Sequence, residues 1–211
     1  MKNDQQEPRA WGEVASRTVA HYQGRADDFW EGTKDHDVSQ NIDALLGALG
    51  GDPPRRILDL GCGPGRDLVS FKRLGHEPTG LDGCEAFCEM ARAHSGCPVL
   101  HQDFMALDLE PESFDGIFAN ATLFHVPSGE LEKVLGGLYA ALRSGGVFFS
   151  SNPRGQNQEG WNGERFGAYH DLETWSGWMT RAGFAPISHY YRPQGLPRSE
   201  QPWLASLWRK P

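Results

Sequence analysis

The sequence predicts a doubly wound α/β fold, in which helices cover both faces of a mostly parallel sheet. Two observations support this prediction. Short apolar segments of strand length alternate with segments of helical periodicity, and a glycine-rich turn follows the first well-defined strand. Because 211 residues is an ordinary length for one α/β domain, we expect residues 1–211 to form a single domain.

The first fifty residues carry two helical patterns. Apolar residues at helical spacing predict a leading helix or two over 12–30, with Gly24 weakening the middle. A further helix is expected at 40–49, with Ser39 as its N-cap and Gly50 at its end. We expect residues from about 10 to 50 to form a helical lid on the sheet.

The rest of the chain alternates between strands and helices. Strands are expected at 57–60, 76–81, 98–101, 114–119, 147–151, 184–190 and 202–208. Helices are expected at 66–74, 84–94, 130–142 and 171–182, with Ser128 as the cap of the third. The segments 152–167 and 193–197 are rich in Gly and Pro and are predicted to be loops. The last two strands then form an antiparallel hairpin at one edge of a seven-stranded, Rossmann-like sheet.

Composition narrows the classes of partner. A net charge of −8 without a basic stripe argues against nucleic acid, because phosphate binding needs clustered Lys and Arg. The apolar runs are of strand length and Met1–Arg9 is polar, so we expect no membrane span or signal peptide, and a cytoplasmic protein. The four cysteines form no CxxC pair, so we expect no metal site. Cys84 and Cys88 are interpreted as small apolar residues of one helix face, with metal binding as the alternative.

A glycine turn marks the expected ligand site. In open α/β sheets, ligands bind beyond the carboxyl ends of the strands, and residues 59–65 read Asp-Leu-Gly-Cys-Gly-Pro-Gly directly after one strand. A tight structural turn explains the glycines equally well. Asp59 would repel a pyrophosphate and favour a cationic group. The glycine spacing matches neither a dinucleotide motif nor a P-loop, so a cationic, ribose-bearing cofactor fits better.

Acidic residues follow the next two strands. Asp82 lies about 20 residues beyond the glycine turn, where nucleotide-binding folds place a carboxylate on the ribose hydroxyls. Asp103 and Phe104 follow the third strand, where a carboxylate accepts from an adenine amino group and a ring packs on the base. Either Asp alone is also explained as a surface loop residue. Together with Asp59, they indicate one nucleoside-type cofactor.

These segments resemble the motifs of class I S-adenosylmethionine (SAM)-dependent methyltransferases. The resemblance rests on 57–65, Leu81-Asp82, 102–104, 114–115 and 142–146, and it extends over residues 20–190. It implies SAM as the cofactor and S-adenosylhomocysteine (SAH) as its product. The residues that would bind the cofactor are Trp30, Asp59, Gly61, Cys62, Gly63, Asp82, Gly83, Asp103, Phe104, Asn120 and Ala121.

Segments outside the cofactor motifs combine polar and aromatic residues. Such mixtures suit a lid around a small zwitterion, since Arg clamps a carboxylate and aromatic rings cover a flat group. The candidate substrate-binding residues are Tyr22, Phe124, His125, Asn152, Arg154, Trp161, Arg165 and Tyr169. Packing of the leading helix is the alternative for Tyr22 and Trp30, and an isolated surface position is the alternative for each arginine. Trp203 and Trp208 are interpreted as edge-strand core.

The leading segment, residues 152–169 and the tail are similar to the methyltransferase unit fused to ovothiol synthases. That resemblance implies methyl transfer to the imidazole π-nitrogen of 5-mercaptohistidine, giving ovothiol, or of its selenium analogue, giving ovoselenol. The synthase portion is absent from this chain. We therefore expect a separate sulfoxide- or selenoxide-synthase enzyme to supply the small-molecule substrate.

Methyl transfer needs the acceptor lone pair in line with the sulfonium methyl group, so positioning supplies much of the rate. His125, His36 and Asp37 are the candidate catalytic residues that set the imidazole tautomer or accept its proton, and a loop hydrogen bond or helix cap is the alternative for each. Two rival functions stay open. One is a methyltransferase for another small thiol, amine or carboxylate, and the other is a noncatalytic SAM-binding regulator. A nicotinamide oxidoreductase is disfavoured by the glycine spacing.

Overall fold

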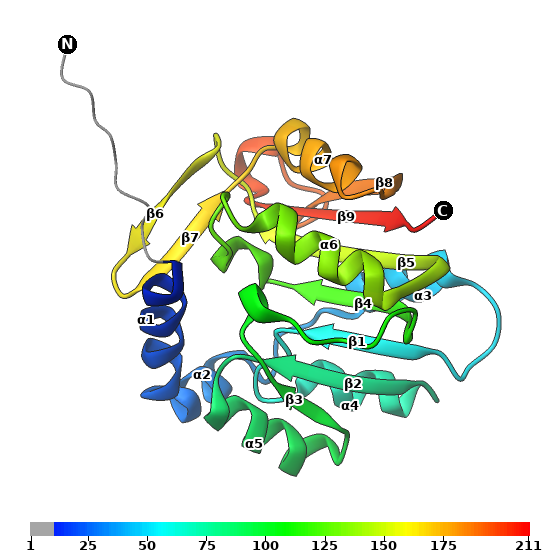
Figure 1. Ribbon diagram of the computed structural model, residues 1–211, viewed down its shortest axis with the longest axis horizontal. Coiled ribbons are helices and arrows are strands. Elements are labelled where there is room, and N and C mark those ends of the chain that lie inside the picture. Colours follow the sequence, from blue (N-terminus) through cyan, green and yellow to red (C-terminus); the bar gives the residue numbers. More distant parts are fainter. Residues whose placement is uncertain (1–10) are drawn as a thin grey trace.

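A seven-stranded sheet forms the centre of the computed structural model, which describes residues 11–211 (Figure 1). The polar stretch Met1–Arg9 lies outside the described residues. In spatial order the strands are β3 (Val99–His101), β2 (Glu77–Asp82), β1 (Arg56–Leu60), β4 (Phe114–Asn120), β5 (Leu142–Pro153), β9 (Trp203–Arg209) and β8 (Ala185–Arg192). Strands β1 to β5 pair in parallel, and β9 runs antiparallel to both β5 and β8. The predicted doubly wound, Rossmann-like α/β fold with an edge hairpin is therefore confirmed.

Helices cover both faces of this sheet. They are α1 (Trp11–Gln23), α2 (Ala26–Thr33), α3 (Ser39–Leu49), α4 (Arg66–Arg73), α5 (Glu85–Ser95), α6 (Leu131–Ala141) and α7 (Leu172–Arg181). Helices α6 and α7 lie on the near face in Figure 1, and α3 and α4 pack on the opposite face. Short 3-10 helices are η1 (Phe104–Ala106), η2 (Leu123–His125) and η3 (Arg198–Glu200). Within residues 11–211, no helix combines the length and apolar character needed to cross a membrane.

The central strands alternate their side chains between the two helical layers. Leu58 and Ile117 belong to the apolar cluster under α6 and α7, whereas Ile57 and Phe118 belong to the cluster under α3 and α4. All four side chains are fully buried. Because both faces are apolar, a ligand site on this sheet has to form where the strands end.

A second, two-stranded sheet lies where the sequence predicted a loop. Strands β6 (Gln158–Asn162) and β7 (Arg165–Tyr169) form an antiparallel hairpin, so the loop prediction for 152–167 was wrong over these residues. The hairpin lies beside α1 in Figure 1. Phe166 packs against Val14 of α1, and its backbone N–H donates to Thr18 Oγ1 at 3.1 Å. The hairpin is therefore stabilised by contacts with a segment far away in the sequence.

Two predicted helix caps were also wrong. Helix α3 begins at Ser39 itself, and the carboxylate of Asp37 accepts from the Ser39 backbone N–H at 2.9 Å. Helix α6 has Glu130 at its N-cap position, while the Ser128 backbone N–H donates to the Glu159 carboxylate at 2.9 Å. In both places a nearby carboxylate makes the stronger, charge-assisted hydrogen bond.

The glycine turn after β1 allows a matched test of close packing. Gly61 and Gly50 both have a positive φ, of 71° and 63°. A Cβ on Gly61 would overlap the Thr122 side chain, whereas nothing lies within 4 Å of a Cβ on Gly50. We expect Gly61→Ala to lower the free energy of unfolding by about 1–3 kcal/mol more than Gly50→Ala, as measured in urea. Equal losses in the two variants would contradict the close contact with Thr122.

Candidate functional site

Three neighbouring cavities open at the carboxyl ends of the central strands. The first has a volume of about 420 Å³ and is lined by residues that include Tyr22, Phe29, Gly61, Gly63, Asp82, Gly83, Gln102, Asp103, Phe104, Ala121 and His125. The second, of about 520 Å³, is lined by residues that include Phe29, Trp30, His36, Asp37, Gly61, Cys62, Gly63, Arg66, Asn120, Ala121, Arg192 and Trp203. The third, of about 230 Å³, is lined by Phe124, His125, Pro153, Asn162, Arg165, Phe166, Tyr169 and Trp203.

Shared walls join these cavities. Gly61, Gly63 and Ala121 line both the first and the second cavity, so one elongated ligand can span the two. His125 lines the first and third cavities, and Trp203 lines the second and third. The third cavity therefore adjoins both of the others.

Asp82 at the end of β2 organises the first cavity. Its Oδ2 accepts from the Gly63 backbone N–H at 3.0 Å, and its Oδ1 accepts from the Cys84 backbone N–H at 2.9 Å. Burial raises the pKa of this carboxyl to about 6, against the opposing effect of the backbone donors Cys84, Gly63 and Gly83. Each carboxylate oxygen keeps a second lone pair for a hydroxyl group of a ligand.

Asp59 lies under the glycine turn and lines neither of the adjoining cavities. The residue is 2% exposed, and its Oδ2 has no hydrogen-bond partner among the described residues. Burial and the neighbouring Asp67 carboxylate raise the pKa of Asp59 well above its usual range. A cationic group bound above the turn would relieve this repulsion and favour the ionised carboxylate.

Asp103 and Phe104 follow β3 and line the first cavity as neighbours. Asp103 Oδ1 accepts from the Met105 backbone N–H at 2.9 Å, which caps η1 and leaves Oδ2 free for a donor group. Gln102, the residue before Asp103, also lines this cavity, and its side-chain amide is bonded to the backbone of Asp108. The loop after β3 thus presents a carboxylate beside an aromatic ring.

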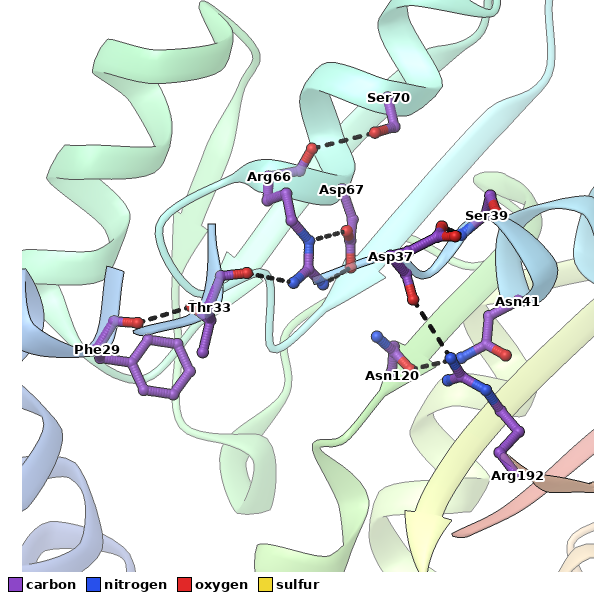
Figure 2. A network of polar contacts seen from close by, with 10 residues as sticks. All are labelled: Phe29, Thr33, Asp37, Ser39, Asn41, Arg66, Asp67, Ser70, Asn120 and Arg192. Carbon is purple, nitrogen blue, oxygen red and sulfur yellow. Dashed lines mark hydrogen bonds and ion pairs between the residues drawn. The ribbon is translucent and has the colours of Figure 1, made fainter. Parts of the chain in front are cut away.

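The end of β4 carries Asn120 and Ala121. Ala121 has φ of 60°, a left-handed conformation that is uncommon outside glycine, and its N–H donates to Ser151 O at 2.7 Å. Asn120 Oδ1 accepts from Asn41 Nδ2 at 2.9 Å, as Figure 2 shows. Asn41 Oδ1 in turn accepts from the Tyr190 hydroxyl at 2.8 Å. This chain of hydrogen bonds fixes the Asn120 side chain on the wall of the second cavity.

Trp30, His36 and Asp37 line the second cavity, not the wall that carries His125. The Trp30 ring stacks on His94 with centroids 4.4 Å apart. The Asp37 carboxylate is bonded to the start of α3, and hydrogen bonding to Ser39 lowers its pKa. The structure therefore does not bring the three candidate catalytic residues together, because His36 and Asp37 lie apart from the cavities of His125.

His125 is held by two defined hydrogen bonds. Its Nδ1 lies 2.6 Å from Phe166 O, and because a carbonyl only accepts, Nδ1 carries the proton. Its Nε2 lies 3.0 Å from the Tyr22 hydroxyl, which is therefore the donor. Burial lowers the pKa of His125 to about 4, and nearby Arg165 and His21 contribute, although the bond to Phe166 opposes the shift. His125 is thus neutral at pH 7, with a defined tautomer.

The third cavity joins aromatic rings with one cationic side chain. Phe124 and Tyr169 have ring centroids 6.1 Å apart, and Arg165 lies on the same cavity wall. Arg165 Nη1 donates to the Tyr22 hydroxyl at 3.4 Å, and no carboxylate of residues 11–211 forms an ion pair with it. This cavity can accommodate a flat group with a negative charge at one end.

Three predicted substrate residues lie outside these cavities. Arg154 donates to the backbone oxygens of Gln201 and Arg198 at 2.7 and 2.6 Å. Trp161 is 41% exposed and lies under the Arg17 guanidinium at 4.3 Å. Asn152 lines only a small void of about 10 Å³ beside Phe124. Backbone oxygens thus hold the Arg154 side chain and Arg17 covers the Trp161 ring, whereas Asn152 Oδ1 is buried without a hydrogen-bond partner among the described residues.

Several cavity residues were not singled out as site residues from the sequence. Phe29, Met105, Asn162, Arg192 and Trp203 line the three cavities. Arg192 ends β8, so the rule that sites follow strands was a usable signal for it. Trp203 and Trp208 were both interpreted as edge-strand core. Trp208 is 3% exposed in the core, with its Nε1 donating to Ser206 Oγ at 2.9 Å, whereas Trp203 lines the second and third cavities.

The cysteines are buried free thiols. Cys62 and Cys88 belong to an apolar cluster between α4 and α5, while Cys84 Sγ lies 3.3 Å from Gln23 Oε1. In the part of the chain that the structure describes, no group of three His, Cys, Asp or Glu side chains is placed to hold a metal ion. The fold thus uses these cysteines as small packing residues.

Comparison with known sequences identifies the segment that contains the glycine turn. Residues 57–146 match a family described as a methyltransferase domain. The chain is 32% identical over 166 residues to a ubiquinone biosynthesis O-methyltransferase of Proteus mirabilis (strain HI4320), covering 75% of this chain and 61% of that protein. It is 33% identical over 101 residues to a sterol 24-C-methyltransferase of Clavispora lusitaniae (strain ATCC 42720), covering 44% of this chain and 26% of that protein. The chain thus spans about a quarter of the sterol enzyme's length.

Comparison with solved structures addresses the fold. The 1,6-didemethyltoxoflavin-N1-methyltransferase of Burkholderia thailandensis, solved with 1,6-didemethyltoxoflavin and SAH, has a TM-score of 0.79 at 22% identity, over 100% of this chain and 98% of that one. A SAM-dependent methyltransferase from Thermotoga maritima, described as a possible histamine N-methyltransferase, has a TM-score of 0.69 at 21% identity, over 90% of this chain and 98% of that one. Residues 57–146 are therefore similar to a methyltransferase domain, and the chain shares its overall fold with these SAM-dependent methyltransferases.

Proposed function

We propose that the protein is an enzyme that transfers the methyl group of SAM to the imidazole π-nitrogen of a histidine-derived acceptor. The acceptor is 5-mercaptohistidine or 5-selenohistidine, which a separate synthase enzyme would supply. The observation that carries this proposal is the junction of the three cavities at His125 and Trp203. A cofactor that spans the first two cavities lies beside the third, which is then left for the acceptor.

The first cavity suits the adenosine part of SAM. Asp82 would accept from the ribose hydroxyls, because both of its oxygens already face the glycine turn and keep free lone pairs. Asp103 Oδ2 would accept from the adenine amino group while Phe104 packs on the ring, and Gly83 leaves room beside the ribose. These roles follow from the positions of the residues on one continuous cavity wall.

The second cavity suits the methionine part of SAM. Gly61, Cys62 and Gly63 provide backbone without bulky side chains, and Asn120 and Ala121 form the opposite wall. Trp30 closes this cavity from α2. Asp59, buried and without a partner at Oδ2, favours the positive charge of the cofactor above it.

The third cavity suits the acceptor. Phe124 and Tyr169 would cover the imidazole ring, and Arg165 would pair with the amino acid carboxylate. In the transfer, the ring nitrogen lone pair forms a bond to the methyl carbon. The carbon–sulfur bond breaks, and its electron pair stays on sulfur as SAH leaves. The thiolate or selenolate of the acceptor balances the positive charge that the ring gains.

His125 would fix the acceptor tautomer through Tyr22. Burial raises the pKa of Tyr22, so its hydroxyl stays protonated and donates to His125 Nε2. The Tyr22 oxygen then has a lone pair for the N–H of the other ring nitrogen, which leaves the π-nitrogen lone pair free for the methyl group. A His125 pKa of about 4 makes the imidazole a weak base, which fits orientation of the acceptor better than strong proton removal.

Two structural relatives support a nitrogen acceptor. The Burkholderia thailandensis enzyme is named as an N1-methyltransferase, and the Thermotoga maritima protein is described as a possible histamine N-methyltransferase. Because both proteins are only about a fifth identical to this chain, they support the proposal through their fold alone. The curated relatives carry O- and C-methyltransferase names, so the acceptor panel below includes other chemical classes.

Incubation with SAM and an acceptor panel tests this function directly. The panel is 5-mercaptohistidine, 5-selenohistidine, histidine, histamine and cysteine, with products followed by mass spectrometry and ring-methyl NMR. We expect a ring N-methyl product from the thiol or the selenol, because the third cavity combines ring-covering aromatic groups with Arg165. Binding of SAH without turnover of any acceptor would discard the imidazole proposal and favour a noncatalytic role.

Asp82→Asn tests the ribose assignment. We expect the free energy of SAH binding to weaken by about 1–3 kcal/mol in calorimetry, because the ribose loses its charged acceptor. Ribose donation favours the ionised carboxylate, whose pKa is about 6 without ligand, so wild-type affinity should fall as the pH drops through 6. The variant should lack this pH dependence. Glu89→Gln, an exposed change on α5, is the control, and unchanged SAH affinity in Asp82→Asn would refute the assignment.

Tyr22→Phe tests the hydrogen bond to His125. We expect kcat to fall about 10²-fold while SAH affinity is retained, because the ring keeps its contacts with Phe29 and Phe87 but loses the hydroxyl. Tyr139→Phe is the matched control, since Tyr139 packs on Phe184 and lines none of the three cavities. A wild-type kcat in Tyr22→Phe would exclude the hydroxyl from the reaction.

A further inference from the structure

One cationic side chain of the second cavity has no role in the chemistry proposed so far. Arg192 is the last residue of β8, is half-buried, and lies on the cavity wall with Asn120 and Trp203. Within the described part of the chain, the one hydrogen bond of its side chain runs from Nη2 to the backbone oxygen of Asp37, at a long 3.4 Å. Among residues 11–211, no carboxylate lies within ion-pair distance of this guanidinium.

The neighbouring arginine of the same cavity is already neutralised. Arg66 Nε and Nη2 donate to the two oxygens of Asp67 at 2.7 and 3.0 Å, and Nη1 donates to Thr33 O at 2.8 Å. The Asp37 carboxylate, the acidic group nearest in sequence to the Arg192 contact, points to the start of α3. Figure 2 shows both arrangements, with Arg66 facing Asp67 and Arg192 reaching toward the Asp37 backbone. Arg192 is therefore the cation of this cavity that keeps donors for a ligand.

An oriented amide lies on the same wall. Asn120 Oδ1 is occupied by Asn41 Nδ2, so the Asn120 amino group is the part left to face the cavity. Asn41 is fully buried and is itself fixed by the Tyr190 hydroxyl, two residues before Arg192 on β8. Figure 2 shows the Asn41 and Asn120 amides beside the Arg192 side chain. A guanidinium and an amide donor thus lie together on one wall.

We infer that Arg192, with the Asn120 amide, forms a carboxylate-binding subsite at the β8 end of the second cavity. A planar guanidinium pairs with a carboxylate through two parallel hydrogen bonds, and the amide supplies a third donor. A multiply charged phosphate fits less well, because Asp37 and Asp67 line the same cavity. The subsite therefore binds a single negative charge.

Two ligands of the proposed reaction carry such a carboxylate. One is the methionine part of SAM or SAH in the second cavity, and the other is an amino acid acceptor whose carboxylate reaches past Trp203 to Arg192 instead of pairing with Arg165. The inference rests on the proposed function for these two sources. The chemistry at Arg192 is the same for both, so the experiment has one arm for each.

The test compares ligands with and without a carboxylate in Arg192→Gln and the wild-type chain. Calorimetry gives the Kd of SAH and of 5′-methylthioadenosine, which lacks the amino acid part. Steady-state kinetics give KM for the acceptor that is turned over and for its decarboxylated analogue. In one of the two arms, we expect Arg192→Gln to raise the Kd or KM of the ligand that has the carboxylate about 10- to 100-fold. The value for the matching ligand without the carboxylate should stay unchanged. Arg192→Lys should recover part of the loss.

The outcomes separate the sources and the controls. A loss confined to SAH assigns the subsite to the cofactor, and a loss confined to the acceptor KM assigns it to the acceptor. Wild-type values in both arms, or equal losses for the ligands without a carboxylate, would overturn the inference. Arg198→Gln is the matched control, since Arg198 stacks on Tyr191 and lines none of the three cavities. Binding of SAH to the wild-type chain tests the proposed function separately. If Arg192→Gln changes neither the SAH Kd nor the acceptor KM, only the subsite is refuted.

Discussion

Burial of the central strands on both faces is the constraint on which the rest of the structure depends. Side chains of β1 and β4 alternate between two apolar layers, so neither face of the sheet is available for a ligand. Ligand-facing groups then collect where the strands end and the chain turns. Gly61 and Ala121 adopt left-handed backbone conformations at these turns, and both line the first and second cavities. Irregular backbone thus occurs at the place where a cofactor can use it.

The parallel sheet and the cofactor wall could be predicted because their signals are local. Strands β1, β4 and β5 contain apolar runs, Asp82 ends β2, and Asp103 comes shortly after β3, so the chain order alone placed both carboxylates at one edge. The hairpin β6–β7 could not be predicted in this way. Its strands are short and rich in Gly and polar residues, and Phe166 is stabilised by Val14 and Thr18 of α1. Such non-local contacts leave little trace in the hydrophobic pattern.

The arginines show why residue type did not settle the acceptor site. Arg154, Arg165 and Arg192 share the same charge and lie in the same half of the chain, yet they differ in what accepts their hydrogen bonds. The Arg154 side chain donates to backbone oxygens, whereas among residues 11–211 the side chains of Arg165 and Arg192 each make a single long hydrogen bond of 3.4 Å. Availability for a ligand depends on these partners, which come from loops and strands far apart in the sequence. Only the folded chain distinguishes the three.

His125 connects the parts of the chain that the sheet itself does not hold together. Tyr22 from α1 bonds to its Nε2, and Phe166 from the hairpin bonds to its Nδ1. The same hairpin residue is tied to α1 through Thr18. Helix α1, the hairpin and the loop after β4 therefore form a closed set of contacts around one neutral imidazole. Because Tyr22 lines the first cavity and Arg165 the third, a cofactor that orders Tyr22 also orders the wall against which an acceptor would bind.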